Sequence, residues 1–362
     1  MIQQRPIRYK VGAMGQEVNL GILGAGKMAY WHLRAYRALP GVRIRAICNP
    51  KSERGRKLAL RFGIPHVFRD PEELFRLPGL DGVDICIPTG LHKELICRAI
   101  QRGLHVYTEK PMCLSIEEAD EIVETNRRLG KIIFVGYNLR FCPEFLKVKE
   151  ALASGELGDV KYIWIQRGAW LNTDSYIFNP EWNAGIITEL SSHALDLLRW
   201  WGFLEVEHVY AEGTNVFAQY PEPDTVCLNI KFQNGAMAVV TNSYGMPGIS
   251  TEVCILGSRK MLRAKYGKCW VQSHPPHWSI PRLLRITFRE AVIYPYRILY
   301  NPFRGSCAHF VDCIRRTQPS LSNEIEGRET IRLASMLQES YSKGQVVAPR
   351  RKMEPFFSAS MS

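Results

Sequence analysis

A short apolar segment that runs directly into a glycine-rich loop sets the strongest limit on how this chain folds. Val18–Leu23 reads as a buried strand, and Gly24-Ala25-Gly26-Lys27-Met28-Ala29 follows it and opens a helical pattern. In a strand, loop and helix of this order, Gly24 permits a tight turn and Gly26 lets the backbone approach a pyrophosphate. Ala29 is small enough for close packing of the helix on the strand. The segment therefore predicts a dinucleotide-binding βα unit.

The next helix and strand complete the expected cofactor site. The first helical residues, Lys27 and Met28, offer backbone amides to phosphate oxygens. The strand at Val42–Cys48 ends at Asn49, where an Asp or Glu would bind the adenosine ribose. An amide and the nearby cation Lys51 take that place here. We expect NAD(P) as cofactor; the choice stays open, with a slight lean to NADP.

The length of 362 residues is more than one core usually holds, and the patterning divides the chain into two domains. Apolar strands alternate with helices through residues 17–142, which predicts a doubly wound parallel sheet, the Rossmann arrangement of α/β proteins. Residues 143–347 carry several alternating strand-like runs, with a hairpin signal at Asn234-Gly235. They predict an α+β substrate and oligomerisation domain with an open, largely antiparallel sheet. We expect residues 1–16 and 348–362 to be a flexible leader and tail.

The composition is that of a globular protein, with 46% hydrophobic and 23% charged residues. No run of 18 apolar residues and no secretory signal pattern occurs, so we expect a cytoplasmic protein. The ten cysteines include no CxxC pair and several lie in apolar runs, which favours reduced thiols in the core.

The net charge of +12 is concentrated in one stretch. Residues 259–304 hold ten lysines and arginines against one acid, Glu290, which gives +9. Such a stretch suits an anionic partner, and a solvated face is the alternative. It has no recognised nucleic-acid motif and no clean helical stripe, so we expect no nucleic-acid binding and favour a substrate or subunit contact over a membrane surface.

A lysine motif follows the strand-like segment at residues 104–107. Glu109-Lys110-Pro111 stands at the C-terminal end of that strand, where open α/β sheets bind ligands. There the Lys110 ammonium can polarise a carbonyl or stabilise an alkoxide. A solvated surface lysine is the alternative for the tripeptide alone.

The loop before it, residues 88–92, ends a neighbouring strand at the same edge of the sheet. We expect Pro88, Thr89 and His92 beside the cofactor, together with Glu109 and Lys110. For His92 a structural loop histidine is an equal alternative.

These motifs occur in an order and spacing that resemble the glucose-fructose oxidoreductase and inositol dehydrogenase (Gfo/Idh/MocA) family. They are the glycine loop, the run from Asp84 to His92, Glu109-Lys110-Pro111, and Gly136-Tyr137-Asn138-Leu139-Arg140-Phe141-Cys142-Pro143. The resemblance extends over roughly Val18 to Val347. It implies an NAD(P)-dependent oxidoreductase, places Lys110 at the substrate, and implies a cis peptide before Pro111.

A helix is expected over residues 185–200, with Glu189, His193 and Asp196 on one face at offsets of four and three. A hydrogen-bonded core histidine is the alternative for His193. The family pattern is Asp-x-Gly-x-His with an Asp three residues on, and this chain departs from it with Glu189 and Ser191. The longer acid leaves its hydrogen bonding to the substrate open, whereas acid–base chemistry at His193 is retained. Glu189 and His193 make only half a metal site, so we expect no metal.

Several further residues are candidates for substrate binding. Trp164, Arg167 and Trp182 can present aromatic faces and a cation to a sugar or an anionic group, or they can be ordinary core and loop residues. Arg140 follows a strand end near the domain junction. We expect Arg140 and Asp196 at the substrate as well.

Together these features predict an enzyme that moves hydride between nicotinamide and a secondary alcohol or ketone of a sugar, polyol or sugar nucleotide. Lys110, His193 and Glu189 are its expected catalytic residues, and a homo-oligomer, dimer or tetramer, is expected. Two alternatives stay open. One is an NAD-dependent glycosidase or lyase that oxidises the sugar transiently, and the other is a non-catalytic NAD(P)-binding sensor.

Overall fold

The computed structural model describes residues 16–169, 179, 181–217, 222–246, 250–265, 267–273 and 303–349. The predicted leader and tail therefore lie almost wholly outside the described residues, as does most of the basic stretch.

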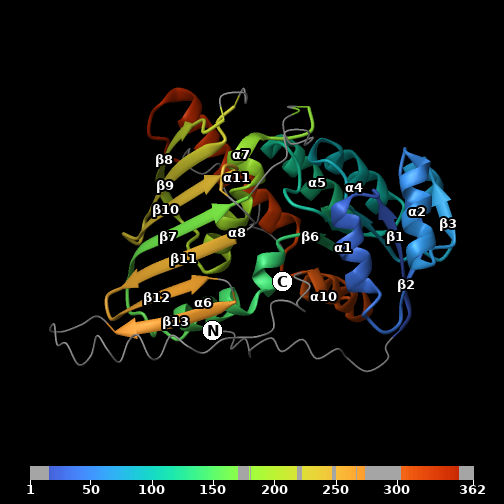
Figure 1. The fold of residues 1–362 in the computed structure, drawn as a ribbon, viewed down its shortest axis with the longest axis horizontal. Helices are drawn as coiled ribbons and strands as arrows, with labels where there is room; N and C mark the ends of the chain where they lie inside the picture. Colours follow the sequence, from blue (N-terminus) through green and yellow to red (C-terminus); the bar gives the residue numbers. More distant parts are fainter. Residues whose placement is uncertain are drawn as a thin grey trace, which may run out of the picture.

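The first half of the chain forms a six-stranded parallel sheet in the order β3-β2-β1-β4-β5-β6 (Figure 1). This order confirms the predicted doubly wound Rossmann sheet. The strands are β1 (Val18–Leu23), β2 (Val42–Cys48), β3 (His66–Phe68), β4 (Gly82–Ile85), β5 (His105–Thr108) and β6 (Ile133–Val135). The helices between them are α1 (Lys27–Tyr36), α2 (Ser52–Phe62), α3 (Pro71–Phe75), α4 (His92–Gln101) and α5 (Ile116–Leu129), with short 3-10 turns η1 (Thr89–Leu91) and η2 (Asn138–Phe141).

Local sequence signals fix where these helices begin and end. Asp70 accepts a hydrogen bond from the Glu72 amide and so caps α3, and Ser115 caps α5 through the Glu118 amide. Gly130 ends α5 with a φ of 62°, a left-handed conformation that glycine adopts without steric cost. These signals are local, because Asp70 and Ser115 each lie within three positions of the amide that they bind.

The second half forms a seven-stranded sheet in the order β13-β12-β11-β7-β10-β9-β8. Its neighbours pair antiparallel except for β7 and β10, which are parallel, so the largely antiparallel sheet is confirmed. The strands are β7 (Val160–Gly168), β8 (Val206–Thr214), β9 (Thr225–Phe232), β10 (Met237–Ser243), β11 (Ser250–Gly257), β12 (Lys260–Lys265) and β13 (Lys268–Ser273). Gly235, with a φ of 84°, makes the predicted turn between β9 and β10.

Helices cover one face of this second sheet and connect it to the first domain (Figure 1). They are α6 (Pro143–Ala153), α7 (Gly185–Glu189), α8 (Ser192–Trp200) and α11 (Glu324–Lys343). Alternate residues of β7, Ile163 and Ile165, are fully buried against them. The helix α10 (Phe303–Arg316) instead packs on α1, and its Phe310 joins the core of the first domain. The chain thus returns to the first domain at α10, although residue 142 was predicted as the boundary between the two domains.

The helix predicted over residues 185–200 is broken. Residues 185–189 form α7, residues 192–200 form α8, and the amides of Leu190 and Ser191 both bond to the carbonyl of Ile186. The break leaves the Glu189 carbonyl free to accept hydrogen bonds from the side chains of Lys110 and Ser192. The predicted single helix is therefore wrong: Glu189 ends α7, whereas His193 and Asp196 lie on α8.

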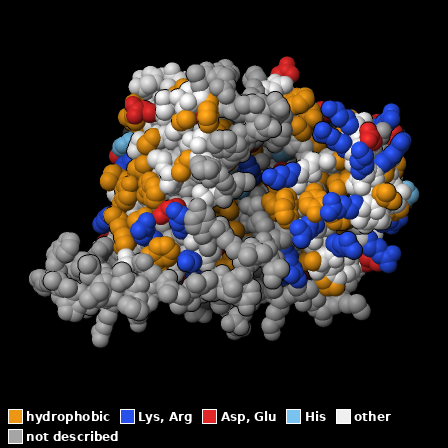
Figure 2. Space-filling view, in the orientation of Figure 1, with side chains coloured by type: hydrophobic (Ala, Val, Ile, Leu, Met, Phe, Trp, Pro, Cys, Tyr) orange, Lys and Arg blue, Asp and Glu red, His pale blue; other side chains and the backbone are white. Residues whose placement is uncertain are grey.

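The described part of the basic stretch serves the fold more than expected. Lys260 pairs with Glu156, whereas Arg263 and Lys265 both pair with Glu252 across β11 and β12. Figure 2 shows Lys and Arg side chains gathered instead over the side of the first domain where α1 and α2 lie. Residues 27–61 there hold ten basic residues against one acid.

Candidate active site

The glycine loop after β1 leaves room for a phosphate group. Gly24 has a φ of 101°, and a Cβ there would lie 2.2 Å from the Cys86 carbonyl oxygen, so only glycine fits. A Cβ on Gly26 would meet nothing within 4 Å, and no side chain caps the start of α1. The first amides of α1 are therefore not capped by a side chain, and the residues present fit a dinucleotide pyrophosphate.

The expected ribose position at the end of β2 carries no acid. Asn49 donates from its side chain to the Lys51 carbonyl oxygen at 2.7 Å, which orders the loop. The side chain of Lys51 is exposed. Both predicted residues thus lie at the sheet edge that carries the glycine loop.

A lysine, a glutamate and a threonine from three separate segments meet between the two domains. The Lys110 ammonium donates to the Glu189 carbonyl oxygen at 2.9 Å and lies 3.7 Å from its carboxylate. Thr89 donates to the other Glu189 carboxylate oxygen at 2.7 Å. The peptide between Lys110 and Pro111 is cis, as the resemblance implied. Lys110, predicted at the end of β5, is thus joined to residues of the second domain.

Burial sets the protonation of the two acid–base groups at this site. Glu189 is almost fully buried; this raises the pKa of its carboxyl, and the Lys110 charge and the Thr89 hydrogen bond oppose the rise. Burial, with the charges of Arg167 and Lys110, lowers the pKa of His193 well below its ordinary value. His193 is therefore a neutral imidazole near pH 7, and its Nδ1 is buried with no hydrogen-bond partner among the described residues. A neutral, unsatisfied ring nitrogen can accept a proton.

His92 is tied into the backbone and is not free to act on a ligand. Its Nδ1 lies 2.9 Å from the Pro111 carbonyl oxygen and its Nε2 lies 2.9 Å from the Ile87 carbonyl oxygen. Burial lowers the pKa of His92, so a neutral ring donates to one of these two carbonyls. This geometry favours the structural alternative, in which His92 holds the loops after β4 and β5 together. Pro88 accepts the Leu91 amide in the same turn.

Arg140 and Asp196 bind each other. The Arg140 Nε lies 3.0 Å from both carboxylate oxygens of Asp196, and its Nη2 also reaches Glu326 at 3.0 Å. Arg140 and Asp196 are both buried. An arginine with two carboxylate partners joins η2, α8 and α11, so the arrangement favours a structural role over the predicted substrate contact.

The three remaining substrate candidates lie in different places. Trp164 lies between Ile163 and Ile165 on β7, so its side chain is on the opposite face of the sheet. Ile163 and Ile165 belong to the core beneath the helices and Trp164 does not, so the sheet separates Trp164 from His193. Arg167 faces the helix side and is buried. The Trp182 carbonyl accepts the Gly90 amide, which places it beside the loop after β4, with its side chain 41% exposed.

Two buried residues near these groups, Asn242 and His32, were not identified from the sequence. Asn242 of β10 lies beside Arg167 in register and donates to Ser191 Oγ at 2.6 Å. His32 of α1 contacts Asp84 and Glu109, each at 2.8 Å. The sequence indicated Asp84 only as the first residue of a run that resembles the family motif. The partners in each of these contacts are about fifty residues or more apart in the sequence, so no local pattern predicts them.

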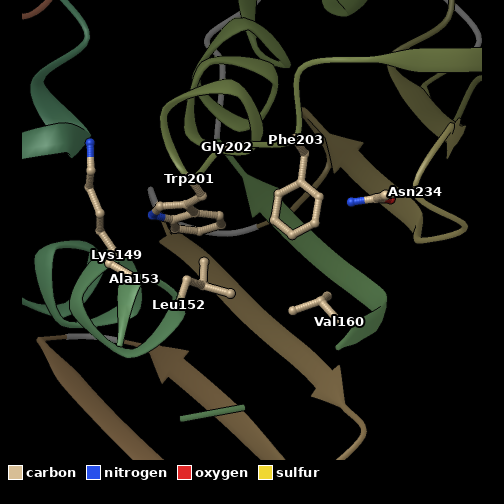
Figure 3. A pocket seen from close by; sticks show the side chains of 8 residues that line it. All are labelled: Lys149, Leu152, Ala153, Val160, Trp201, Gly202, Phe203 and Asn234. Atoms are coloured by element: carbon tan, nitrogen blue, oxygen red, sulfur yellow. The ribbon is translucent and has the colours of Figure 1, made fainter. Parts of the chain in front are cut away.

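A separate hollow lies at the far end of α8, where Trp201 and Phe203 face Leu152 of α6 and Val160 of β7 (Figure 3). Lys149, Ala153, Gly202 and Asn234 complete its lining. None of these residues belongs to the cluster around Lys110, so the hollow is distinct from the candidate site.

A Rossmann sheet with an open glycine loop, and a lysine bound to a buried glutamate between the two domains, are typical of nucleotide-dependent oxidoreductases. The model of an oxidoreductase family with an NAD-binding Rossmann fold matches residues 18–137, and the model of the Gfo/Idh/MocA C-terminal domain matches residues 145–263. The chain belongs to the Gfo/Idh/MocA oxidoreductase family.

Known proteins resemble this chain over most of its length. It is 25% identical to scyllo-inositol 2-dehydrogenase (NAD(+)) of Bacillus subtilis, over 92% of this chain and 97% of that protein. It is 27% identical to myo-inositol 2-dehydrogenase of Thermotoga maritima, over 67% and 73% of the two chains. The crystal structure of GenD2 from gentamicin A biosynthesis in complex with NAD superposes with a TM-score of 0.80 at 21% identity, covering 94% of this chain and 98% of that one.

No helix among the described residues is long and apolar enough to cross a membrane.

Proposed function

We propose that the protein is a dehydrogenase that moves hydride between NAD(P) and a secondary alcohol or ketone of a sugar, polyol or sugar nucleotide. The observation that carries the proposal is the contact of Lys110 with Glu189 at the sheet edge that carries the glycine loop, near enough to His193 for the Lys110 charge to lower the pKa of its ring. The named activities of the inositol dehydrogenases support the substrate class.

The side chains take different parts of the proton chemistry. Lys110 polarises the reacting oxygen with its ammonium, and Glu189 holds that ammonium in place while its buried carboxyl orients a substrate hydroxyl. His193 takes the hydroxyl proton when an alcohol is oxidised, because its lowered pKa keeps it neutral near pH 7. Trp182 borders the site from the loop beside Gly90.

The cofactor would be held by this chain's own backbone and polar groups. Gly24, Gly26 and the first amides of α1 receive the pyrophosphate, and Asn49 lies at the ribose. When bound, the nicotinamide supplies the hydride acceptor or donor. A lean to NADP rests on the exposed Lys51 and the lack of an acid at the end of β2. Lys51→Glu should shift the ratio of NADP to NAD dissociation constants toward NAD, and an unchanged ratio would show that Lys51 does not read the 2′ position.

The test is reduced-cofactor formation with a panel of inositols, sugars and sugar nucleotides. Lys110→Ala should lower turnover roughly 100-fold or more while leaving the NAD(P) dissociation constant nearly unchanged. Lys93→Ala, which removes a surface lysine paired with Glu121, is the matched control and should keep full turnover. Retention of more than about a tenth of turnover in Lys110→Ala would contradict the proposal.

We also propose a homo-oligomer that uses the face of the second sheet opposite its helices. Tyr162, Trp164 and Val239 lie on that face, and Met237 beside them is 49% exposed. Trp164→Asp should then shift the sedimentation mass toward a monomer. A cytoplasmic location, supported by ten cysteines that are all free, is part of the same proposal.

A further inference from the structure

Arg167 is a buried cation that the described fold does not neutralise. It lies near the end of β7, the middle strand of the second sheet, and only 8% of it is exposed. Its Nη1 donates to Thr251 Oγ1 of β11, and its Nε is buried without an acceptor from the part of the chain that the structure describes. Within the described ranges of the chain, no carboxylate lies in ion-pair distance of this guanidinium.

Arg140 shows how the same fold treats a buried arginine of structural use. Arg140 is as deeply buried as Arg167, yet it has Asp196 and Glu326 as carboxylate partners. An isolated buried charge is costly, and folded proteins pair such groups or bind ions with them. Burial lowers the pKa of Arg167 to about 10, which still leaves the guanidinium charged near pH 7. The missing counter-charge is therefore one that a ligand can supply.

The neighbours of Arg167 lead directly to His193. Asn242 stands next to Arg167 in register on β10, and its side-chain amide donates to Ser191 Oγ, two residues before His193. Among the described residues, the Asn242 Oδ1 and the His193 Nδ1 are both buried without partners, like the Arg167 Nε. Three unsatisfied polar atoms thus belong to residues joined by one short chain of contacts. Buried polar groups normally find partners, so this grouping points to a polar ligand.

We propose that Arg167 binds a carboxylate group of the substrate, so that the enzyme acts on a sugar acid or polyol acid. This inference rests on the proposed function, because it places the reacting hydroxyl of the same molecule beside Lys110 and His193. The planar guanidinium matches a carboxylate with two parallel hydrogen bonds, and one cation balances one negative charge. Asn242 and Thr251 are neutral, so the described part of this subsite holds no second cation for a phosphate dianion.

The experiment compares matched pairs that differ only in the carboxylate. D-glucuronate is paired with D-glucose, and D-galacturonate with D-galactose, and binding to the full-length NAD-saturated protein is measured by calorimetry. The acid of each pair should bind roughly 10-fold or more tightly. Arg167→Met should reduce that ratio to about one, and Arg167→Lys should give an intermediate ratio because lysine lacks the planar fork.

Arg263→Met is the matched control. It removes an arginine from the same sheet that pairs with Glu252, so the preference for the acid should persist. Thermal melting monitors folding of each variant, and Arg167→Lys keeps the test open if Arg167→Met does not fold. The proposal is overturned if neither acid binds, if the neutral sugar binds as tightly, if Arg167→Met retains the preference, or if D-glucose 6-phosphate binds more tightly than D-glucuronate.

Turnover separates this inference from the proposed function. Formation of reduced cofactor without any preference for acids would support the dehydrogenase and overturn the carboxylate subsite. Preferential acid binding that disappears in Arg167→Met, without reduced cofactor from any substrate in the wider panel, would support the subsite and overturn the dehydrogenase.

Discussion

Two buried histidines, His32 in the first domain and His193 in the second, have opposite surroundings. His32 lies on α1 with its Nδ1 2.8 Å from Asp84 and its Nε2 2.8 Å from Glu109. Tyr36 also donates to Asp84, at 2.8 Å. Burial alone would lower the pKa of His32, but the Asp84 carboxylate and its neighbours raise it well above the ordinary value. His32 is thus an imidazolium between two carboxylates.

His193 has the reverse arrangement. Its charged neighbours named above, Arg167 and Lys110, are cations, and with burial they lower its pKa. Its Nδ1 has no partner in the described ranges, and the ring of Tyr137 packs edge-on against the His193 ring with centroids 6.5 Å apart. His193 is therefore neutral and has no carboxylate partner among the described residues, whereas His32 is charged and lies 2.8 Å from each of two carboxylates.

This difference indicates a structural role for His32 and a ligand-binding or catalytic role for His193. His32, Asp84 and Cys86 offer metal-ligand atoms within 4.8 Å of one another, but the contact between His32 and Asp84 has the length of a hydrogen bond. His32 also contacts Glu109, the residue just before Lys110, so the cluster supports the segment that carries Lys110. Buried groups with perturbed pKa values occur in both structural and functional sites, so partner count decides between them.

The largest expected effect is on catalysis at the unpaired histidine. His193→Gln should lower turnover roughly 100-fold or more, because glutamine cannot accept the hydroxyl proton. The melting temperature should stay close to that of the wild type, since the Nδ1 of His193 has no hydrogen bond to lose. Steady-state kinetics and thermal melting measure both. A His193→Gln variant that loses stability but keeps its turnover would show that His193, like His32, has a structural role.

The paired histidine should show the opposite pattern. His32→Leu leaves Asp84 and Glu109 buried without their cation, which should cost about 3–5 kcal/mol of unfolding free energy. Denaturant unfolding measures the loss. His66→Leu, at an exposed position of β3, is the control and should change stability by less than about 0.5 kcal/mol. Equal stability of the two variants would show that the His32 cluster is not structural.

A smaller effect is expected at the threonine that joins the two domains. Thr89→Val removes the hydrogen bond to the buried Glu189 carboxylate, a loss of about 1–3 kcal/mol. It should raise the pKa of Glu189 further, because Thr89 acts to lower it, and reduce kcat/KM roughly tenfold. Thr214→Val, at the exposed end of β8, should leave kcat/KM unchanged. A Thr89→Val enzyme with wild-type kinetics would exclude Glu189 from the working site.

Local signals in the sequence predicted the elements and much of the site, and tertiary contacts decided the rest. The glycine loop, the strand alternation and the helix caps depend on residues within a few positions, so the Rossmann sheet followed from the sequence. The break between α7 and α8 did not, because the Lys110 ammonium that binds the freed Glu189 carbonyl is 79 positions away in the sequence. Arg140 resembled a substrate residue until the structure placed Asp196 against it, since an arginine's partner is not visible from its own segment.

The smallest expected effect is a change of stability with pH, which should have opposite signs for the two histidines. The folded-state pKa of His32 is raised, so its stabilisation is fully present below the unfolded value of about 6.5 and is lost as pH rises through the folded pKa. The folded-state pKa of His193 is lowered, so its contribution is fully present above about 6.5 and is lost as pH falls below that value. Melting curves from pH 5 to 9 should therefore show the stability gap between wild type and His32→Leu shrinking as pH rises. The stability of the wild type relative to His193→Gln should instead grow as pH rises from 5 to 7. Because titrating groups that do not contact either histidine cancel in each difference, two trends of the same sign would contradict the opposite charge states of the two histidines.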